Sequence, residues 1–550
     1  MSWIDLDRLL FAQPRRPVCV GLDHPALCDR ALRFATSLQA RGVQRLALHL
    51  DDAGELAIAL LGAWRAGVEV LLPADAQEQT RKRLGKETDL WLDALPVDAS
   101  AALPATELDL DACRLVLCTS GSSGAPKPIG KTLRQLANEV DALERLWGAD
   151  LGDATIVGSV ATQHIYGLLF RVLWPLCAGR PFVRHAQPFP EDMQRVSLEQ
   201  PGFAWVASPA LLKRMGDNLD WPALRAVRRV FSSGGALPTE AGTALHARLG
   251  QAATEIYGSS ETGGIAWRQG GESWTPFAGV ELDMNDEGAL RVASPYLPAG
   301  QVEQTADAVE FGADGRFVLR GRLDRIVKLE EKRISLPALE QALQSHAWVA
   351  DARLGVIQEG RAFLGALVAP SPAGIHALRN QGRRAFTDSL RRHLAGHCEA
   401  IALPRRWRLL AQLPYSSQGK LAQAQVEALL AASRPTQVEP LSAVEQDGEW
   451  RLELEVPLDL AHFAGHFPRT PVLPGVVQID WAQRLARQLI ADLPPRFAGM
   501  EVLKFQQLVR PGDRLQLSLR FDAARGKLYF AFRNGEAACS SGRILLGAAR

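Results

Sequence analysis

The sequence lacks any long hydrophobic run, any large excess of charge and any CxxC pair of cysteines. No apolar stretch approaches the roughly 18 residues that a membrane-spanning helix needs. The formal net charge is +1, which argues against a general nucleic-acid or membrane-surface protein, because neither gains from a nearly neutral chain. The first residues, MSWIDLDRLL, carry acids and no apolar core, so we expect no secretory signal.

The seven cysteines are odd in number and scattered, and none lies in a CxxC pair. We therefore expect neither a disulfide framework nor a zinc site, and a reducing cytoplasm is the natural location. Hydrophobic residues make up 47% of the 550 residues. This is enough for several packed cores, and at about 150 residues per domain the length suggests roughly three or four domains.

The N-terminal part, to about residue 320, alternates short apolar runs with stretches of helical period, which predicts an α/β layered domain. Three apolar runs read as buried strands, at 46–50, 68–73 and 114–120. A helix is expected to begin after Thr132, which fits a capping box with Gln135. Its apolar residues share one face: Leu133, Leu136, Val140, Leu143 and Trp147. The glycine-rich segment before it is therefore predicted to lie between a buried strand and a capped helix.

The C-terminal part has a different pattern. The segment 431–440 contains two prolines and has weak periodicity, so it is the best candidate for a linker. Pro474 and Gly475 open a helix that we expect over about 476–492. Around it, apolar and polar residues alternate with the period of half-buried antiparallel strands, at 451–458, 514–521 and 527–533.

The segment CTSGSSGAPKPIGKT, from Cys118 to Thr132, has the composition of a phosphate-binding loop. Its backbone N–H groups and hydroxyls can point at an anion, because no bulky side chains block the approach. The glycine spacing does not fit the Walker A pattern, since five residues rather than four separate Gly124 and Gly130. The candidate contacts are Thr119, Ser120, Gly121, Ser122, Ser123, Gly124 and Lys127.

Together with further segments in the same order, this loop resembles the adenylate-forming superfamily, which includes acyl- and aryl-CoA synthetases and peptide-synthetase adenylation domains. The resemblance covers about residues 1–430. It implies a large adenylation domain at 1–323 and a small, mobile α+β subdomain at 324–430. The further segments are HIYG at 164–167, SSGGALP at 232–238, YGSSETGG at 257–264, TAD at 305–307, GRLDRIVK at 321–328 and LPYSSQGK at 413–420.

The resemblance implies a role for each matching residue. Tyr257 would stack on adenine, Glu261 would bind magnesium, and Lys420 would be the catalytic lysine. Asp307 and Arg322 would contact the ribose. The hinge would be Asp324, the acyl pocket would include His164, Tyr166 and Ser233, and further nucleotide contacts would come from Gly234, Gly235, Ala236, Gly258, Ser259 and Ser260.

The implied chemistry is ATP-dependent activation of a carboxylic acid. Attack of the carboxylate on the α-phosphate makes an acyl-adenylate, while Lys420 and magnesium on Glu261 neutralise the developing charge. Rotation at Asp324 then removes Lys420 and admits a phosphopantetheine thiol, from CoA or an acyl carrier protein. Glu331 stands where the family usually has glycine, near the path of the thiol. It puts ordinary CoA ligation in doubt and favours a carrier protein as the acceptor.

A second pair of motifs, GHFPRTPVLPGVVQID from Gly465 and VLKFQQLVRPGDRL from Val502, resembles the hotdog-fold 3-hydroxyacyl carrier-protein dehydratases. The resemblance implies an α+β hotdog domain at 441–550, a homodimer through this domain, and His466 with Asp480 as the catalytic pair. The histidine would take a proton from C2 and the acid would help the hydroxyl to leave. The Gly475 N–H would polarise the thioester carbonyl.

The sequence therefore predicts a cytoplasmic, multidomain α/β enzyme that activates a carboxylic acid and dehydrates 3-hydroxyacyl thioesters. We expect it to use ATP, Mg²⁺ and a phosphopantetheine thiol, with an acyl carrier protein as partner and no nucleic acid. The fusion resembles ligase–dehydratase components of aryl-polyene pathways, which would make the acid aryl. Two alternatives stay open: a fatty acyl ligase joined to a hotdog thioesterase, and a ligase whose hotdog domain only dimerises or binds carrier proteins.

Overall fold

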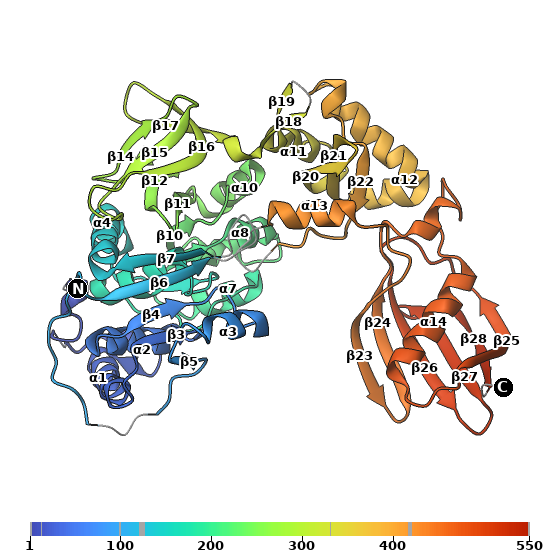
Figure 1. Ribbon diagram of the computed structural model, residues 1–550, viewed down its shortest axis with the longest axis horizontal. Helices are drawn as coiled ribbons and strands as arrows, with labels where there is room; N and C mark the ends of the chain where they lie inside the picture. The colour runs from blue at the N-terminus through green and yellow to red at the C-terminus, as the bar shows by residue number, and fades with distance from the viewer. Residues whose placement is uncertain are drawn as a thin grey trace. The chain divides into compact units, whose positions relative to one another are not determined.

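The structure is a computed structural model that describes residues 3–12, 14–97, 101–119, 127–329, 332–415 and 421–547. The chain divides into two compact units. The first comprises Met1–Leu323 with Tyr415–Lys420, and the second comprises Asp324–Pro414 with Leu421–Arg550 (Figure 1). Among the described helices, none combines the length and the apolar character of a membrane span.

The first unit opens with a five-stranded sheet in the order β5-β3-β4-β6-β7. The strands predicted at 46–50, 68–73 and 114–120 are confirmed as β3, β4 and β6. All neighbours are parallel except β6 and β7. The strands are β3 (Arg45–Leu48), β4 (Glu69–Leu72), β5 (Leu90–Leu92), β6 (Arg114–Thr119) and β7 (Lys127–Thr132). The segment Cys118–Thr132 does lie between β6 and the helix that follows, but its second half forms strand β7, antiparallel to β6, which the sequence did not predict.

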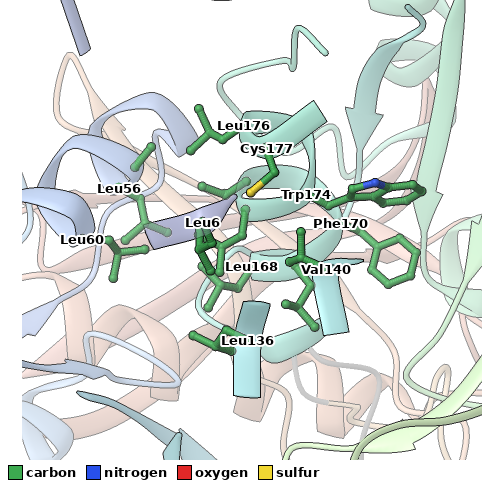
Figure 2. Packing of buried hydrophobic residues seen from close by; sticks show 14 of the residues in the cluster. Leu6, Leu56, Leu60, Leu136, Val140, Leu168, Phe170, Trp174, Leu176 and Cys177 are labelled. Atoms are coloured by element: carbon green, nitrogen blue, oxygen red, sulfur yellow. The ribbon is translucent and has the colours of Figure 1, made fainter. Parts of the chain in front are cut away.

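That helix is α4 (Leu133–Leu151), and its capping box is confirmed. The Thr132 hydroxyl accepts from the Gln135 N–H at 3.3 Å, and the Gln135 side chain accepts from the Thr132 N–H at 2.8 Å. The predicted apolar face is buried. It packs with α2 (Ala53–Arg65) and the helical segment 165–178 into the core of the first unit, as the labelled side chains in Figure 2 show.

A second sheet of the first unit has the order β13-β12-β11-β10-β9-β8. Its strands β8 to β11 are parallel, and β12 turns back antiparallel to β11. The bounds are β8 (Thr155–Gly158), β9 (Phe203–Ala207), β10 (Val227–Ser232), β11 (Thr254–Ser259), β12 (Gly263–Gln269) and β13 (Thr275–Pro276). The carboxyl ends of β9, β10 and β11 therefore meet at one edge, where ligands of open α/β sheets usually bind.

An antiparallel sheet completes the first unit, in the order β14-β15-β16-β17. Its strands are β14 (Glu281–Met284), β15 (Ala289–Ala293), β16 (Glu303–Phe311) and β17 (Phe317–Arg322). An isolated bridge between Trp274 and Phe317 joins it to the region of β13. This sheet carries the TAD segment on β16 and the first two residues of the GRLD segment, Gly321 and Arg322, on the neighbouring β17.

The second unit begins with a smaller α+β part. The hairpin β18 (Ile326–Leu329) and β19 (Lys332–Ser335) leads into α11 (Leu336–Gln344). A three-stranded sheet follows, in the order β20-β21-β22. The remaining bounds are β20 (Val349–Glu359), β21 (Arg361–Pro370), α12 (Pro372–Leu394), β22 (Arg406–Leu409) and α13 (Gln423–Ala431).

The rest of the second unit is a six-stranded antiparallel sheet with one long helix, the α+β arrangement expected of a hotdog domain. The sheet order is β23-β24-β26-β27-β28-β25. Helix α14 (Gly475–Leu489) lies across the sheet (Figure 1), and its Trp481 is fully buried. The predicted helix and strands are confirmed. The strands are β23 (Pro440–Gln446), β24 (Glu449–Glu455), β25 (Arg496–Phe505), β26 (Arg514–Asp522), β27 (Lys527–Asn534) and β28 (Ala537–Gly547).

Candidate active sites

Several residues expected to contact a nucleotide lie at the carboxyl ends of β10 and β11. The segment SSGGALP leaves β10 there, and the Ser233 hydroxyl donates to the Ile256 carbonyl of β11 at 2.9 Å. Gly234 has a φ of +91°, a backbone conformation that residues with a Cβ rarely adopt. Gly234, Gly235 and Ala236 are all exposed. This run therefore presents small residues to solvent beside the end of β11.

Tyr257 lies at the end of β11 and is hydrogen-bonded to the neighbouring sheet. Its hydroxyl donates to Asp307 Oδ2 at 2.6 Å. Burial and the Asp307 charge both raise the pKa of Tyr257. Asp307 on β16 is directly opposite Arg322 on β17, and Arg322 Nη1 is 3.5 Å from Asp307 Oδ1. Three residues expected to contact adenine and ribose are thus brought together, from segments up to 65 residues apart.

Glu261 is at the tip of the tight turn between β11 and β12. The Ser259 N–H donates to the Thr262 hydroxyl at 3.1 Å, and the Thr262 N–H donates to the Ser259 hydroxyl at 3.2 Å. A Cβ on Gly258 would lie 2.2 Å from the Gly263 carbonyl oxygen, so only glycine fits there. The YGSSETGG segment is therefore a closed turn that presents the half-buried Glu261.

The backbone of this turn is hydrogen-bonded by two buried ionisable residues that were not among the predicted site residues. Lys131 on β7 is 4% exposed, and its ammonium donates to the carbonyls of Glu261, at 2.8 Å, and Tyr296, at 2.9 Å. Glu139 on α4 is 6% exposed and accepts from the Gly264 N–H at 2.6 Å. The burial of Glu139 could have been predicted from the sequence, because this residue lies on the predicted apolar face of its helix.

Burial changes the ionisation of both residues. Burial lowers the pKa of Lys131, while the nearby carboxylates of Glu139 and Glu261 oppose that shift. Burial raises the pKa of Glu139 to about 7, against the opposing effects of Lys131 and the Gly264 N–H. Lys131 and Glu139 therefore hold the turn that carries Glu261 through backbone hydrogen bonds, from buried positions where burial disfavours the charged form of each.

The three residues expected at the acyl pocket belong to the ends of neighbouring elements. His164 immediately precedes α5 (Ile165–Leu168). Tyr166, within α5, donates to the Ala207 carbonyl at the end of β9 at 3.3 Å. Burial raises the pKa of Tyr166. Ser233 follows β10, which pairs with β9. The structure thus places Tyr166 and Ser233 at adjacent strand ends.

Several predicted site residues lie outside the described residues: Ser120, Gly121, Ser122, Ser123, Gly124, Glu331 and Lys420. Of the loop, only its two ends are described, with Thr119 opposite Lys127 in the β6–β7 ladder. Asp324 belongs to the short 3₁₀ helix η3 (Leu323–Arg325) and is the first residue of the second unit. The contacts of the phosphate loop and the position of Lys420 stay predictions.

In the hotdog part, His466 and Asp480 have separate partners. His466 is half-buried, and its Nδ1 lies 3.1 Å from the Val472 carbonyl oxygen. Asp480 is exposed on α14, and its Oδ2 accepts from Gln437 Nε2 at 3.1 Å. Within the described residues, no hydrogen bond or ion pair joins His466 to Asp480. The two residues expected to act together are thus held by different neighbours.

Gly475 begins α14 where the expected oxyanion contact would be. A Cβ at this position would lie 2.6 Å from the Phe505 ring of β25, so a larger residue here would require that ring to move. Strand β25 is an edge strand, paired with β28 alone. Apolar side chains of this strand are exposed: Phe497, Met500, Val502, Leu503 and Phe505. An open sheet edge with an apolar surface thus adjoins the start of α14, where Phe505 lies beside Gly475.

Comparisons with known families match both parts of the chain. Residues 69–292 match the family model described as AMP-binding enzyme, and residues 442–543 match the ApeI-like family, described as ApeI dehydratase. A 4-coumarate–CoA ligase of Rhodobacter capsulatus is 28% identical over 315 residues, which cover 56% of this chain and 75% of that protein. A sulfoacetate–CoA ligase of Cupriavidus necator is 24% identical over 372 residues, covering 60% and 70% respectively.

Solved structures agree on the fold of the ligase part. ATP-bound MatB from Rhodopseudomonas palustris superposes with a TM-score of 0.65 at 16% identity, over 77% of this chain and 98% of that one. A benzoate CoA ligase from Burkholderia xenovorans superposes with a TM-score of 0.63 at 20% identity, over 77% and 100%. This chain therefore carries an AMP-binding domain with the fold of the adenylate-forming enzymes, followed by an ApeI-like dehydratase domain of the hotdog type.

Proposed function

We propose that the protein is a bifunctional enzyme. Its first activity converts a carboxylic acid to an acyl-adenylate and passes the acyl group to a phosphopantetheine thiol. Its second activity dehydrates 3-hydroxyacyl thioesters. The observation that supports the first activity best is the joining of Tyr257, Asp307 and Arg322 beside the exposed Gly234–Ala236 run.

The residues at this edge fit a nucleotide. Tyr257 offers an aromatic ring, and Asp307 offers a carboxylate that can accept hydrogen bonds from ribose hydroxyls. Its hydrogen bond to Tyr257 and its proximity to Arg322 hold that carboxylate in place. Bound ATP would supply the leaving group that a free carboxylic acid lacks.

Glu261 fits a magnesium ion that is shared with phosphates. Mg²⁺ in such sites is usually held by one or two carboxylates together with phosphate oxygens and water. Over the described part of the chain, no group of three or more His, Cys, Asp or Glu residues is arranged to hold a metal alone. Lys131 orients the Glu261 backbone, while Lys127 and Lys420 would neutralise negative charge near the phosphates.

We propose an aryl acid as substrate and an acyl carrier protein as acceptor. The likeness to 4-coumarate–CoA ligases supports the aryl acid. The dehydratase-like domain supports the carrier protein, because dehydration between extension steps needs a chain that stays bound to a thiol. ATP–pyrophosphate exchange with hydroxybenzoic, hydroxycinnamic and fatty acids tests the first half, with Lys420→Ala as control. Exchange with fatty acids alone would favour the fatty acyl ligase instead.

For the second activity, the arrangement of His466 supports a general base. An Nδ1–H donated to the Val472 carbonyl leaves a lone pair on Nε2, which can take the C2 proton of a 3-hydroxyacyl thioester. Asp480 would help the hydroxyl to leave, and the Gly475 N–H at the start of α14 would polarise the thioester carbonyl. Hydration of a crotonyl thioester tests this activity. Release of a free acid would favour a thioesterase, and no reaction would favour a carrier-binding scaffold.

We further propose a homodimer through the hotdog domain. The open edge of β25 and its exposed apolar side chains support pairing with a second copy, since such edges are otherwise prone to aggregation. No hydrogen bond or ion pair between described residues joins His466 to Asp480, which is consistent with a site completed by the partner. A cytoplasmic location is part of the proposal too, and it is supported by seven free thiols, six of them buried.

A further inference from the structure

Helix α12 belongs to the small ligase subdomain, residues 324–430. It contacts the segment 466–471, which begins with His466, the proposed base of the dehydratase. The helix is interrupted at Gly382, which has φ +80° and ψ 168°. A Cβ at Gly382 would lie 1.8 Å from the Pro468 carbonyl oxygen and 3.1 Å from the Arg469 Cα. Pro468 follows His466 by two residues. The backbone of α12 therefore touches the 466–471 segment where only glycine leaves room.

Two arginines connect the other end of this segment to α12. Arg510 donates from Nε to the Pro471 carbonyl at 2.7 Å, and its Nη2 donates to the Arg379 carbonyl. Arg379 in turn donates to the Pro511 carbonyl at 2.8 Å and to Asp513 Oδ1 at 2.7 Å. The guanidinium of Arg510 thus bridges one carbonyl of the histidine segment and one carbonyl of α12.

A buried carboxylate anchors the chain just before this segment. Asp459 is 2% exposed, and its Oδ1 accepts from Arg383 Nε of α12 at 2.5 Å and lies 3.0 Å from Arg434 Nε. Separating a buried carboxylate from its two arginine partners costs free energy, because the carboxylate would be left charged and unpaired in a buried position. The neighbouring Leu458 packs into the apolar core of the ligase subdomain. The histidine segment is therefore held by α12 on both sides.

We propose that α12 is a structural part of the dehydratase site, in which Gly382, Arg379 and Arg510 are positioning residues for His466. This inference rests on the proposed dehydratase activity. A general base must lie within hydrogen-bonding reach of the proton it removes, so a displacement of about 1 Å lowers the rate strongly. The dehydratase domain would then depend on the ligase subdomain for its turnover, because these three residues hold the segment that carries His466.

The test uses the full chain with the substitution Gly382→Ala. The kcat for hydration of a crotonyl pantetheine thioester should fall about tenfold or more, with KM within about twofold, because the histidine moves while the acyl site is kept. ATP–pyrophosphate exchange should stay within about twofold of wild type. Gly360→Ala is the matched control: this glycine of the same subdomain also has a positive φ, +68°, but a Cβ there meets nothing within 4 Å. It should keep both activities.

Arg510→Ala provides a second variant, which adds no atoms and removes both carbonyl contacts. It should lower the hydration kcat in the same way and leave exchange unchanged. If Gly382→Ala and Arg510→Ala both hydrate the crotonyl thioester with the kcat of the wild-type protein, the positioning role is overturned. Equal loss in Gly360→Ala, or parallel loss of exchange, would overturn it too, since the effect would then be general destabilisation. A wild-type protein without hydration activity would instead refute the proposed dehydratase itself.

Discussion

The Lys131 ammonium donates a hydrogen bond of 2.8 Å to the backbone carbonyl of Glu261, from a position that is almost inaccessible to water. The two residues are 130 positions apart in the chain. The contact connects the strand that follows the glycine-rich loop with the turn that carries the proposed metal ligand. The glycine-rich segment and the YGSSETGG turn are thus joined by Lys131, which was not among the residues expected to contact the nucleotide.

Replacing Lys131 by methionine should weaken both the fold and the adenylation. Methionine fills the space but leaves the carbonyls of Glu261 and Tyr296 without their donor and leaves Glu139 without a nearby cation. We expect a loss of about 2 kcal/mol or more in the free energy of unfolding and a fall in pyrophosphate exchange of about tenfold. Urea unfolding and exchange assays measure these. Lys82→Met, at a lysine that is 74% exposed, should change neither; an equal effect there would contradict the role of Lys131.

Glu139 should make the stability of the protein fall as the pH rises from about 4.5 to about 7. The unfolded carboxyl loses its proton near its usual pKa of 4.5, whereas the folded protein raises this pKa to about 7. Between these values the folded state binds more protons, so its stability decreases with pH, by an amount on the order of 2–3 kcal/mol. Glu139→Gln keeps a side-chain oxygen for the Gly264 N–H and removes this titration. Urea midpoints at pH 5 and pH 8 should differ less in the variant; an identical pH dependence would argue against the buried, proton-binding Glu139.

The two proposed activities should be separable by single substitutions. Lys420→Ala should abolish acid-dependent pyrophosphate exchange and spare the hydration of a crotonyl thioester, because the lysine acts only on charge developing at phosphate. His466→Ala should remove hydration by a factor of at least about 10² and spare exchange, because the general base is lost. Strong loss of both activities from either change would rule out two independent chemical sites.

Disrupting the open edge of β25 should produce monomers without dehydratase activity. Phe497→Asp places a charge on an exposed apolar side chain of that edge strand. We expect the molar mass measured by sedimentation to fall by half, and hydration to be lost if the partner completes the site. Val444→Asp, at an exposed side chain of β23 on the opposite edge of the sheet, should leave mass and activity unchanged. A monomeric wild-type protein with full hydration activity would refute the dimer proposal.

Local patterns predicted the elements that depend on neighbouring residues. The capping box at Thr132, the apolar face of α4 and the helix that begins at Gly475 all follow from residues within a few positions of one another. Strand β7 was missed because KPIGKT contains a proline and has no apolar alternation. It forms through pairing with β6, which a reading of the segment alone does not reveal.

The long-range contacts of the sites could not be predicted in the same way. Motif resemblance named Tyr257, Asp307 and Arg322, but not the hydrogen bond that joins the first two across 50 positions. Lys131 has its partners 130 and 165 positions away, so no local pattern marks it. Arg434 belongs to the segment predicted as a linker, yet it contacts a buried carboxylate. The domain boundaries and the roles of the site residues stay predictions.

The contacts around Asp459 bear on which part of the enzyme moves. If the ligase subdomain turns about Asp324 during catalysis, the dehydratase domain must turn with it, because Arg383, Arg434 and Leu458 join the two. In a dimer formed through the β25 edges, two dehydratase domains and two ligase subdomains would then make one rigid central frame.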